Sequence, residues 1–451
     1  MVDFDDRPLR IESAGIESVP VEHRHGHARE LFYLWFASNL GILNIVYGAV
    51  VASLGLNFWQ AVAAIGTGLL TFVIVGILSL PGVRQGSTMM VSSSVVFGRR
   101  GNILPTLFSY LTVLGWETAL MCVGTLLLTT LFQRLLGFGY LEAVSVSLPV
   151  SLAATFVWPI FGHATVSSFQ KYASYTFGLL TVPVILFLWP HVDYAFLDSP
   201  GAGPGAFVSA VTFIFSGTTL GWVNYASDYS RYLPLGTSEK KVVLYPLIGA
   251  FLPLFALSML GFLLVSREEI ASSSNPFLLI GSLMPAWFLA VYYVLGFGMN
   301  TSTNIMNAYS SGLNLLLLGL RMPRYRSVWI DAAVSGAGAA FILLSLRSFL
   351  GSFESFLSLL GDWAGPWSMV MVVHTLLSGR VRVHGPARPL LSWLIGTAVA
   401  FLLSSSPFFT GPLATGIFRN SDAGVLLGSF VSLVLSLVLL GGGGTRRPSS
   451  S

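Results

Sequence analysis

The sequence of 451 residues is 54% hydrophobic and only 9% charged. Soluble domains carry about 25% charged residues, so a chain with this little charge is expected to face lipid over most of its exterior. The formal net charge of +4 comes from basic residues scattered between apolar runs, which excludes a nucleic-acid-binding patch. Cys122 is the only cysteine, so a disulfide within the chain is impossible.

The first thirty residues are strongly charged and lack the apolar core that a cleavable signal peptide requires. We therefore expect residues 1–30 to form a cytosolic N-terminal tail. His23, His25 and His27 in this tail could bind a metal. Three histidines in a mobile segment are more often solvated, so we predict no metal site.

About 20 apolar residues in a helix span the hydrocarbon core of a bilayer. Windows of that kind predict an all-α polytopic membrane protein with about twelve transmembrane helices. They begin near residues 31, 58, 104, 144, 172, 206, 242, 285, 328, 353, 388 and 422. Residues 198–205 read as a loop, and residues 442–451 are expected to be a flexible cytosolic tail.

The distribution of Lys and Arg predicts the orientation of these helices. If the N-terminus lies in the cytoplasm and the helices alternate, all but four of the 23 basic residues fall on the cytoplasmic side. The exceptions are Arg134, Arg267, Arg347 and Arg419. Cytoplasmic loops carry an excess of Lys and Arg, so we predict a multi-pass protein of the cell membrane with both termini in the cytoplasm.

Two of the expected helices are interrupted by small and polar residues, the first at 38–44 and the sixth at 216–222. Transporters place binding sites at such breaks, in matching positions of two structural repeats. Glycine-rich packing faces are the alternative. The five-helix offset favours two inverted repeats, residues 31–200 and 201–380, followed by two further helices at 381–441. This arrangement predicts a secondary transporter.

Ionisable residues inside a bilayer are costly and therefore candidates for function. Glu117 lies near the middle of the third span with no cation three or four residues away. It could form a structural hydrogen bond between helices, bind the edge of an amino-substituted heterocycle, or couple a proton gradient to transport. Asp228 and Arg231, at the cytoplasmic end of the sixth span, could form a gate; we favour a simple helix-end ion pair.

The eighth span is the most polar, and Asn300, Thr303, Asn304 and Asn307 share one helical face. Carboxamides both donate and accept hydrogen bonds, which suits the mixed edge of a heterocycle. The adjacent hydroxyls of Ser302 and Thr303 are oxygen ligands of the type that suits Na⁺.

Trp116 and Trp222 lie inside spans three and six, away from the membrane interfaces where Trp is usual. Two aromatic faces could stack on a planar ligand, although core packing would explain either residue alone. Together with the amide stripe, they favour a flat, polar, uncharged ring as the ligand. The sequence contains no HExxH, CxxC or Walker motif, and no GxSxG with partners, so an enzyme is not expected.

Several of these segments resemble the nucleobase–cation symporter family, most closely its purine–cytosine permease branch, from about residue 11 to about residue 440. The motif at 304–310 is the most specific of them. The other similar segments are residues 15–20, 35–40, 86–102, 221–229 and 356–363.

The resemblance implies a leucine-transporter-type fold of five plus five inverted-repeat helices with two extra helices. It also implies import of a nucleobase or related heterocycle with H⁺ or Na⁺. Trp116 and Trp222 would stack on the substrate, and Asn304 and Asn307 would hydrogen-bond it. Backbone near Asn39 and Ile42 would assist them. In the Na⁺-coupled branch, the ion would lie against the Met299 carbonyl, Ser302 and Thr303.

Two residues depart from the family pattern. Leu120 replaces an amide that often lies four residues after the third-span Trp, and Glu117 stands where this branch often has Asn. The added carboxyl favours H⁺ over Na⁺. Our hypothesis is therefore a symporter of cytosine or purines that works by alternating access, with no cofactor besides the coupling cation and no obligate protein partner. A carrier of another flat ring, such as allantoin, a hydantoin or a vitamin, is the alternative. A channel or receptor is a further one.

Overall fold

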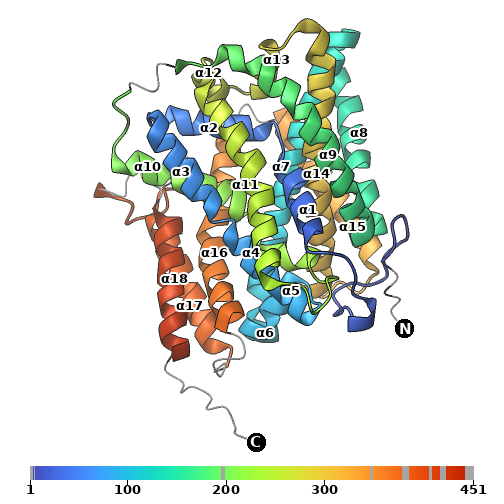
Figure 1. The fold of residues 1–451 in the computed structure, drawn as a ribbon, viewed down its shortest axis with the longest axis vertical. Helices are drawn as coiled ribbons and strands as arrows, with labels where there is room; N and C mark the ends of the chain where they lie inside the picture. The colour runs from blue at the N-terminus through green and yellow to red at the C-terminus, as the bar shows by residue number, and fades with distance from the viewer. Residues whose placement is uncertain are drawn as a thin grey trace, which may run out of the picture.

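The computed structural model describes residue 4 and residues 6–194, 199–345, 349–377, 385–405, 409–416 and 423–441. The predicted tail 442–451, Asp198 and the expected outside residues Arg347 and Arg419 lie outside this part of the chain. Long helices dominate the described residues and run mostly along one direction (Figure 1). The all-α class predicted from the sequence is therefore confirmed.

The first half of the chain begins with a broken helix, which is followed by a bent one and three long ones. The helices are α1 (Arg29–Asn39), α2 (Leu43–Ser53), α3 (Phe58–Leu70), α4 (Val73–Leu78), α5 (Leu80–Gln85), α6 (Met89–Gly101), α7 (Ile103–Leu136), α8 (Tyr140–Phe161) and α9 (His163–Leu188).

The second half begins with another interrupted helix, which is followed by one long helix, two short ones, three long ones and two of intermediate length. The elements are α10 (Pro204–Ile214), η4 (Phe215–Thr219), η5 (Val223–Tyr229), α11 (Glu239–Leu263), α12 (Arg267–Ser272), α13 (Pro276–Ser282), α14 (Leu289–Leu317), α15 (Arg324–Ser345), α16 (Phe349–Leu377), α17 (Ala387–Leu403) and α18 (Gly424–Gly441).

Eight helices within the described residues are long and apolar enough to cross a membrane, or nine if the bent pair α1 and α2 counts as one span. The three further expected spans correspond to α14, which carries the polar stripe, and to the shorter apolar helices α17 and α18. A total of twelve spans therefore stays a prediction.

Both breaks indicated by the sequence are present. α1 and α2 meet at 65°, and extended backbone at Leu40 separates them. In the sixth span, the α-helical hydrogen bonding of α10 gives way to a π-helical turn in η4 and then to the 3₁₀ turns of η5. Such changes free backbone groups from regular hydrogen bonding and often mark functional sites.

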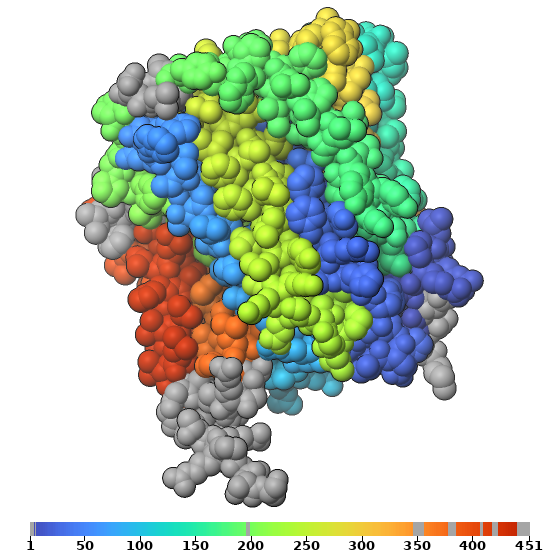
Figure 2. All heavy atoms as spheres, viewed as in Figure 1, coloured from blue at the N-terminus to red at the C-terminus, as the bar shows by residue number. Residues whose placement is uncertain are grey.

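Glycines allow α2 and α11 to pack backbone against backbone. A Cβ atom on Gly48 would lie 1.8 Å from the Ser258 carbonyl oxygen, and one on Gly261 would lie 1.9 Å from that of Ile45. Small residues at membrane helix interfaces permit this close approach. α11 also packs along α1, and the two lie side by side on the face shown in Figure 2. The first broken span is thus held firmly from one side.

The N-terminal segment is folded against the ends of the helices instead of forming a free tail. Its backbone N–H groups at Glu12, Val19 and His25 donate to the carbonyls of Phe161, Gly86 and Tyr232, at 2.9, 2.9 and 2.6 Å. These contacts join the segment to α8, α5 and the end of the sixth span. The segment and the C-terminal end of α18 lie toward the same end of the bundle (Figure 1).

Candidate functional site

A pocket lies between α7, α14 and the two broken spans. Its walls combine aromatic rings, glycines and side-chain amides, a composition typical of small-molecule sites. The sequence-predicted residues that line it are Asn39, Ile42, Trp116, Trp222, Thr303 and Asn307, and Asn300 of the polar stripe also lines it. The structure thus gathers residues from four distant segments around one space.

The aromatic walls are held by contacts behind them. Trp222 donates from Nε1 to Asn39 Oδ1 at 3.1 Å, and Trp35 packs edge-on against its ring at 5.2 Å between centroids. Trp116 packs edge-on against Phe356 at 5.6 Å. Asn39, in turn, donates to the Trp35 carbonyl at 2.9 Å. The Asn39 side chain therefore ties Trp222 to the end of α1.

A row of hydrogen bonds orients the amides of α14. The Tyr225 hydroxyl donates to Asn307 Oδ1 at 2.7 Å, Asn307 Nδ2 donates to Asn304 Oδ1 at 3.3 Å, and Asn304 Nδ2 donates to the Glu117 carbonyl at 3.1 Å. A carboxamide can donate twice and accept twice. Asn307 therefore keeps one N–H and one acceptor position for a ligand.

Two predicted binding residues lie behind the cavity wall. Asn304 and the Glu117 side chain are fully buried, and neither lines the cavity. Asn304 acts on the site through Asn307, which it orients. Both Glu117 carboxylate oxygens lack a hydrogen-bond partner in the described structure, although Ser311 and Asp331 lie close enough to interact with that carboxyl.

Sequence reasoning missed Asp331. It is fully buried in α15 and accepts hydrogen bonds from the hydroxyls of Tyr110 and Ser311, each at 3.0 Å. A single acidic residue inside the apolar run of the ninth predicted span was the available signal. The rule that singled out Glu117 applies equally to Asp331.

The predicted cation residues are only partly brought together. Thr303 Oγ1 lies 2.8 Å from the Ser38 carbonyl oxygen and 3.2 Å from that of Met299, so three oxygens meet beside the first break. Ser302 instead bonds Gln170 twice. The Ser302 hydroxyl donates to Gln170 Oε1 at 2.8 Å, and Gln170 Nε2 donates to the Ser302 backbone carbonyl at 2.7 Å. In this conformation the Ser302 side chain is engaged with α9.

Asp228 and Arg231 have separate partners rather than the ion pair that we expected. Asp228 accepts from the backbone N–H of Met89 at 2.8 Å. Arg231 pairs with Glu12 at 2.6 Å and donates to the Gly15 carbonyl at 2.7 Å. The helix-end spacing suggested a local pair, but the buried carboxylate that meets Arg231 comes from the folded N-terminal segment.

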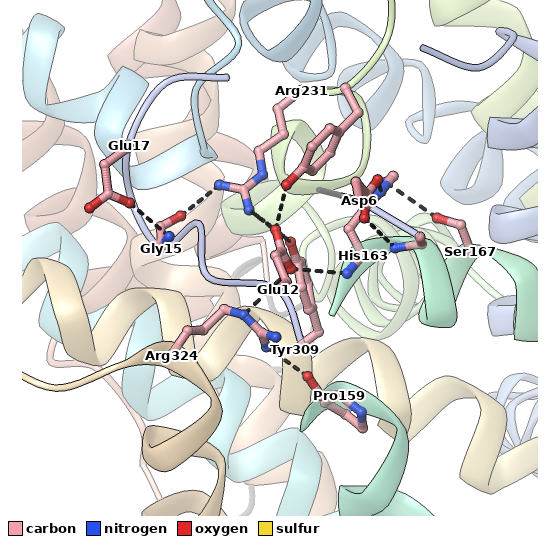
Figure 3. A network of polar contacts seen from close by, with 12 residues as sticks. Asp6, Glu12, Gly15, Glu17, Pro159, His163, Ser167, Arg231, Tyr309 and Arg324 are labelled. Atoms are coloured by element: carbon pink, nitrogen blue, oxygen red, sulfur yellow. Dashed lines mark hydrogen bonds and ion pairs between the residues drawn. The ribbon is translucent and has the colours of Figure 1, made fainter. Parts of the chain in front are cut away.

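Glu12 is the centre of a buried network at this end of the bundle (Figure 3). It accepts from the Tyr232 hydroxyl at 2.6 Å and the His163 N–H at 3.0 Å, and Arg324 lies 3.5 Å away. Burial acts to raise the pKa of Glu12, but Arg231 and Arg324 lower it below its ordinary value. Glu12 is thus held ionised where α9, α15 and the sixth span meet.

The comparisons with known proteins agree with this architecture. Residues 18–387 match the family model described as permease for cytosine/purines, uracil, thiamine, allantoin. YxlA of Bacillus subtilis, named as a purine-cytosine permease, is 28% identical over 96% of both chains. The purine-cytosine permease fcyB of Emericella nidulans is 25% identical over 93% of this chain and 86% of its own.

A solved structure shares the fold. Mhp1, a nucleobase-cation-symport-1 family transporter in a closed conformation with bromovinylhydantoin bound, superposes with a TM-score of 0.71. It is 18% identical, and the match covers 99% of this chain and 96% of Mhp1. The leucine-transporter-type fold expected from the sequence is therefore confirmed. The chain belongs to the family of permeases for cytosine/purines, uracil, thiamine and allantoin, and is a multi-pass membrane transporter rather than an enzyme.

Proposed function

We propose that the protein imports a nucleobase, cytosine or a purine, together with a cation. The observation that carries the proposal is the Asn307 carboxamide, which is held by Tyr225 and Asn304 on a cavity that Trp116 and Trp222 also line. A base offers neighbouring donors and acceptors on its edge and a flat face for stacking. The spare donor and acceptor of Asn307 match that edge, and the indoles match the face.

The two broken helices supply the moving parts in this proposal. We assign residues 31–200 and 201–380 to two inverted repeats and 381–441 to the added helices. The spans that contain the breaks would rock against the rest of the bundle and expose the cavity to each side in turn. The basic residues favour cytoplasmic termini in the cell membrane, and the folded N-terminal segment would then lie on the cytoplasmic side.

For the coupling cation, H⁺ is favoured over Na⁺. The buried Glu117 has no hydrogen-bond partner for its carboxylate, and a carboxyl in that environment is suited to taking up a proton. The oxygens of Ser38, Met299 and Thr303 support the Na⁺ alternative. There, however, Thr303 already hydrogen-bonds the carbonyls, and Ser302 is engaged with Gln170.

A second substrate class has specific support. The structure of Mhp1 contains bromovinylhydantoin, which is also a flat nitrogen heterocycle. Thiamine and allantoin appear in the description of the family. The same amide and indole groups would recognise such rings, so the alternative differs from a nucleobase in the ligand and not in the mechanism.

Binding to the purified protein tests this site. Radiolabelled cytosine and adenine should bind, with hypoxanthine, uracil and allantoin as competitors, and Asn307→Ala should abolish binding because the amide contacts are lost. Asn314→Ala is the matched control: Asn314 is a buried amide of the same helix that bonds Ser109 and does not line the cavity. Unchanged binding by the Asn307 variant, with a normal melting profile, would show that the substrate binds elsewhere.

A further inference from the structure

Glu117 and Asp331 form a pair of buried acidic side chains behind the cavity wall. Both are 0% exposed. They lie on α7 and α15, which pack together and against α14. Tyr110, about two helical turns before Glu117 on α7, donates to Asp331 and so places the two acids on facing sides of these helices. Acidic groups at this depth are rare and are usually tied to function.

The hydrogen-bond donors around the pair serve Asp331. Its Oδ1 accepts from Tyr110 and its Oδ2 from Ser311. Each hydroxyl has one hydrogen to give, so neither has a second one for Glu117, whose oxygens have no hydrogen-bond partner. A protonated Glu117 would bring its own hydrogen and would need no donor. One added proton would also remove one of the two negative charges from the pair.

No cation forms an ion pair with either carboxyl among the residues that the structure describes. Arg324, on the same helix as Asp331, is bound to Glu12 and to the Pro159 carbonyl. The other titratable groups that interact with Glu117 are Tyr110, from its own helix, and Tyr225, from η5. Two carboxylates that share a site of low dielectric cannot both be ionised without a large cost.

Hydrogen bonds connect the backbone of Glu117 with the cavity. The Glu117 carbonyl accepts from Asn304, which accepts from Asn307, which accepts from Tyr225. A change of charge at Glu117 would thus act on the groups placed to touch the substrate. Proton and substrate binding can favour one another through this row, as coupled transport requires.

We propose that Glu117 and Asp331 together form the proton-binding site, which holds one shared proton during import. The inference rests on the proposed cation coupling and names the groups that carry it. The proton comes from water on the outer side with the substrate and returns to water on the cytoplasmic side, where entry of water into the opened cavity would lower the cost of leaving both carboxyls ionised. Tyr110 and Ser311 position Asp331. Only O–H bonds form and break in this step.

Reconstituted vesicles can separate coupling from substrate recognition. Counterflow of radiolabelled cytosine, or of adenine where cytosine gives none, requires exchange of substrate but no net proton movement. Accumulation driven by an imposed pH gradient requires both. Glu117→Gln and Asp331→Asn should each keep counterflow and lose accumulation. Glu142→Gln, at an exposed carboxyl at the start of α8, should keep both.

The outcomes distinguish the two proposals. If either variant accumulates substrate as the wild type does, the shared-proton site is overturned and the transport function stands. If the wild type shows no counterflow of either base, the proposed nucleobase function fails. The pair is then tested alone by infrared spectroscopy of the purified protein. A protonated-carboxyl band should be present at neutral pH and absent from the double variant; identical spectra would overturn the site.

Discussion

Replacing Glu12 by Gln should loosen the cytoplasmic end of the bundle as proposed here. The substitution keeps the shape of the side chain but removes the charge that faces Arg231 and Arg324, whose side chains are both 0% exposed. Removing one partner of a buried ion pair costs about 3–5 kcal/mol because the remaining charge is left uncompensated. With two guanidinium groups beside one carboxylate, we expect the upper part of that range.

Hydrogen–deuterium exchange in detergent measures this effect locally. A loss of at least about 4 kcal/mol in the opening free energy corresponds to an increase of at least about a thousandfold in the exchange rate of amides that exchange through that opening. The increase should be concentrated in residues 12–19 and around Arg231. Glu22→Gln, at an exposed carboxyl of the same segment, is the control and should leave exchange unchanged. Equal protection in wild type and Glu12→Gln would refute the reasoning.

Three further predictions concern packing, pH and substrate binding. Gly48→Ala should lower the melting temperature, since its Cβ would overlap the Ser258 carbonyl; Gly41→Ala, with nothing within 4 Å, should not. The hydrogen bond to Asp6 raises the pKa of His25. The stability that protonated His25 gives to the folded N-terminal segment is therefore complete below the ordinary pKa of 6.5 and is lost as pH rises through the raised pKa. Exchange in residues 23–28, corrected for intrinsic rate, should therefore increase as pH rises through this raised pKa in wild type but not in His25→Asn. Trp222→Phe keeps an aromatic face but loses the hydrogen bond to Asn39. The substrate Kd should therefore rise by about tenfold, for a loss of about 1.4 kcal/mol. The control variant Trp287→Phe, at an exposed position, should bind substrate normally.

The parts of the fold that depend on local sequence could be predicted. Apolar runs of the required length indicated the helices, and the small and polar residues at 38–44 and 216–222 indicated the breaks. The polar stripe of α14 has helical spacing, so the shared face of Asn304 and Asn307 follows from the sequence. The sequence does not indicate which of these two residues borders the cavity, because that depends on the packing of α14 against α7.

Contacts between distant segments could not be predicted in the same way. Arg231 has an acidic residue three positions away, but its partner is Glu12, 219 residues away along the chain. From its charged residues alone, the N-terminal segment is read as a solvated tail. Its folding depends on buried arginines that it contacts only in the assembled bundle. Asp331 could have been singled out by the same rule as Glu117. What the sequence does not contain is the approach of the two residues, because it depends on the packing of α15 against α7.

Uptake of radiolabelled cytosine by cells that lack their own carriers tests the central claim most directly. The assay is run with and without Na⁺ and with a protonophore, and adenine, hypoxanthine, uracil and allantoin are added as competitors. We expect saturable uptake that the protonophore abolishes, that persists without Na⁺, and that cytosine or a purine inhibits at micromolar concentration. No inhibition by any of the bases would contradict nucleobase transport, and uptake that requires Na⁺ and resists the protonophore would contradict proton coupling.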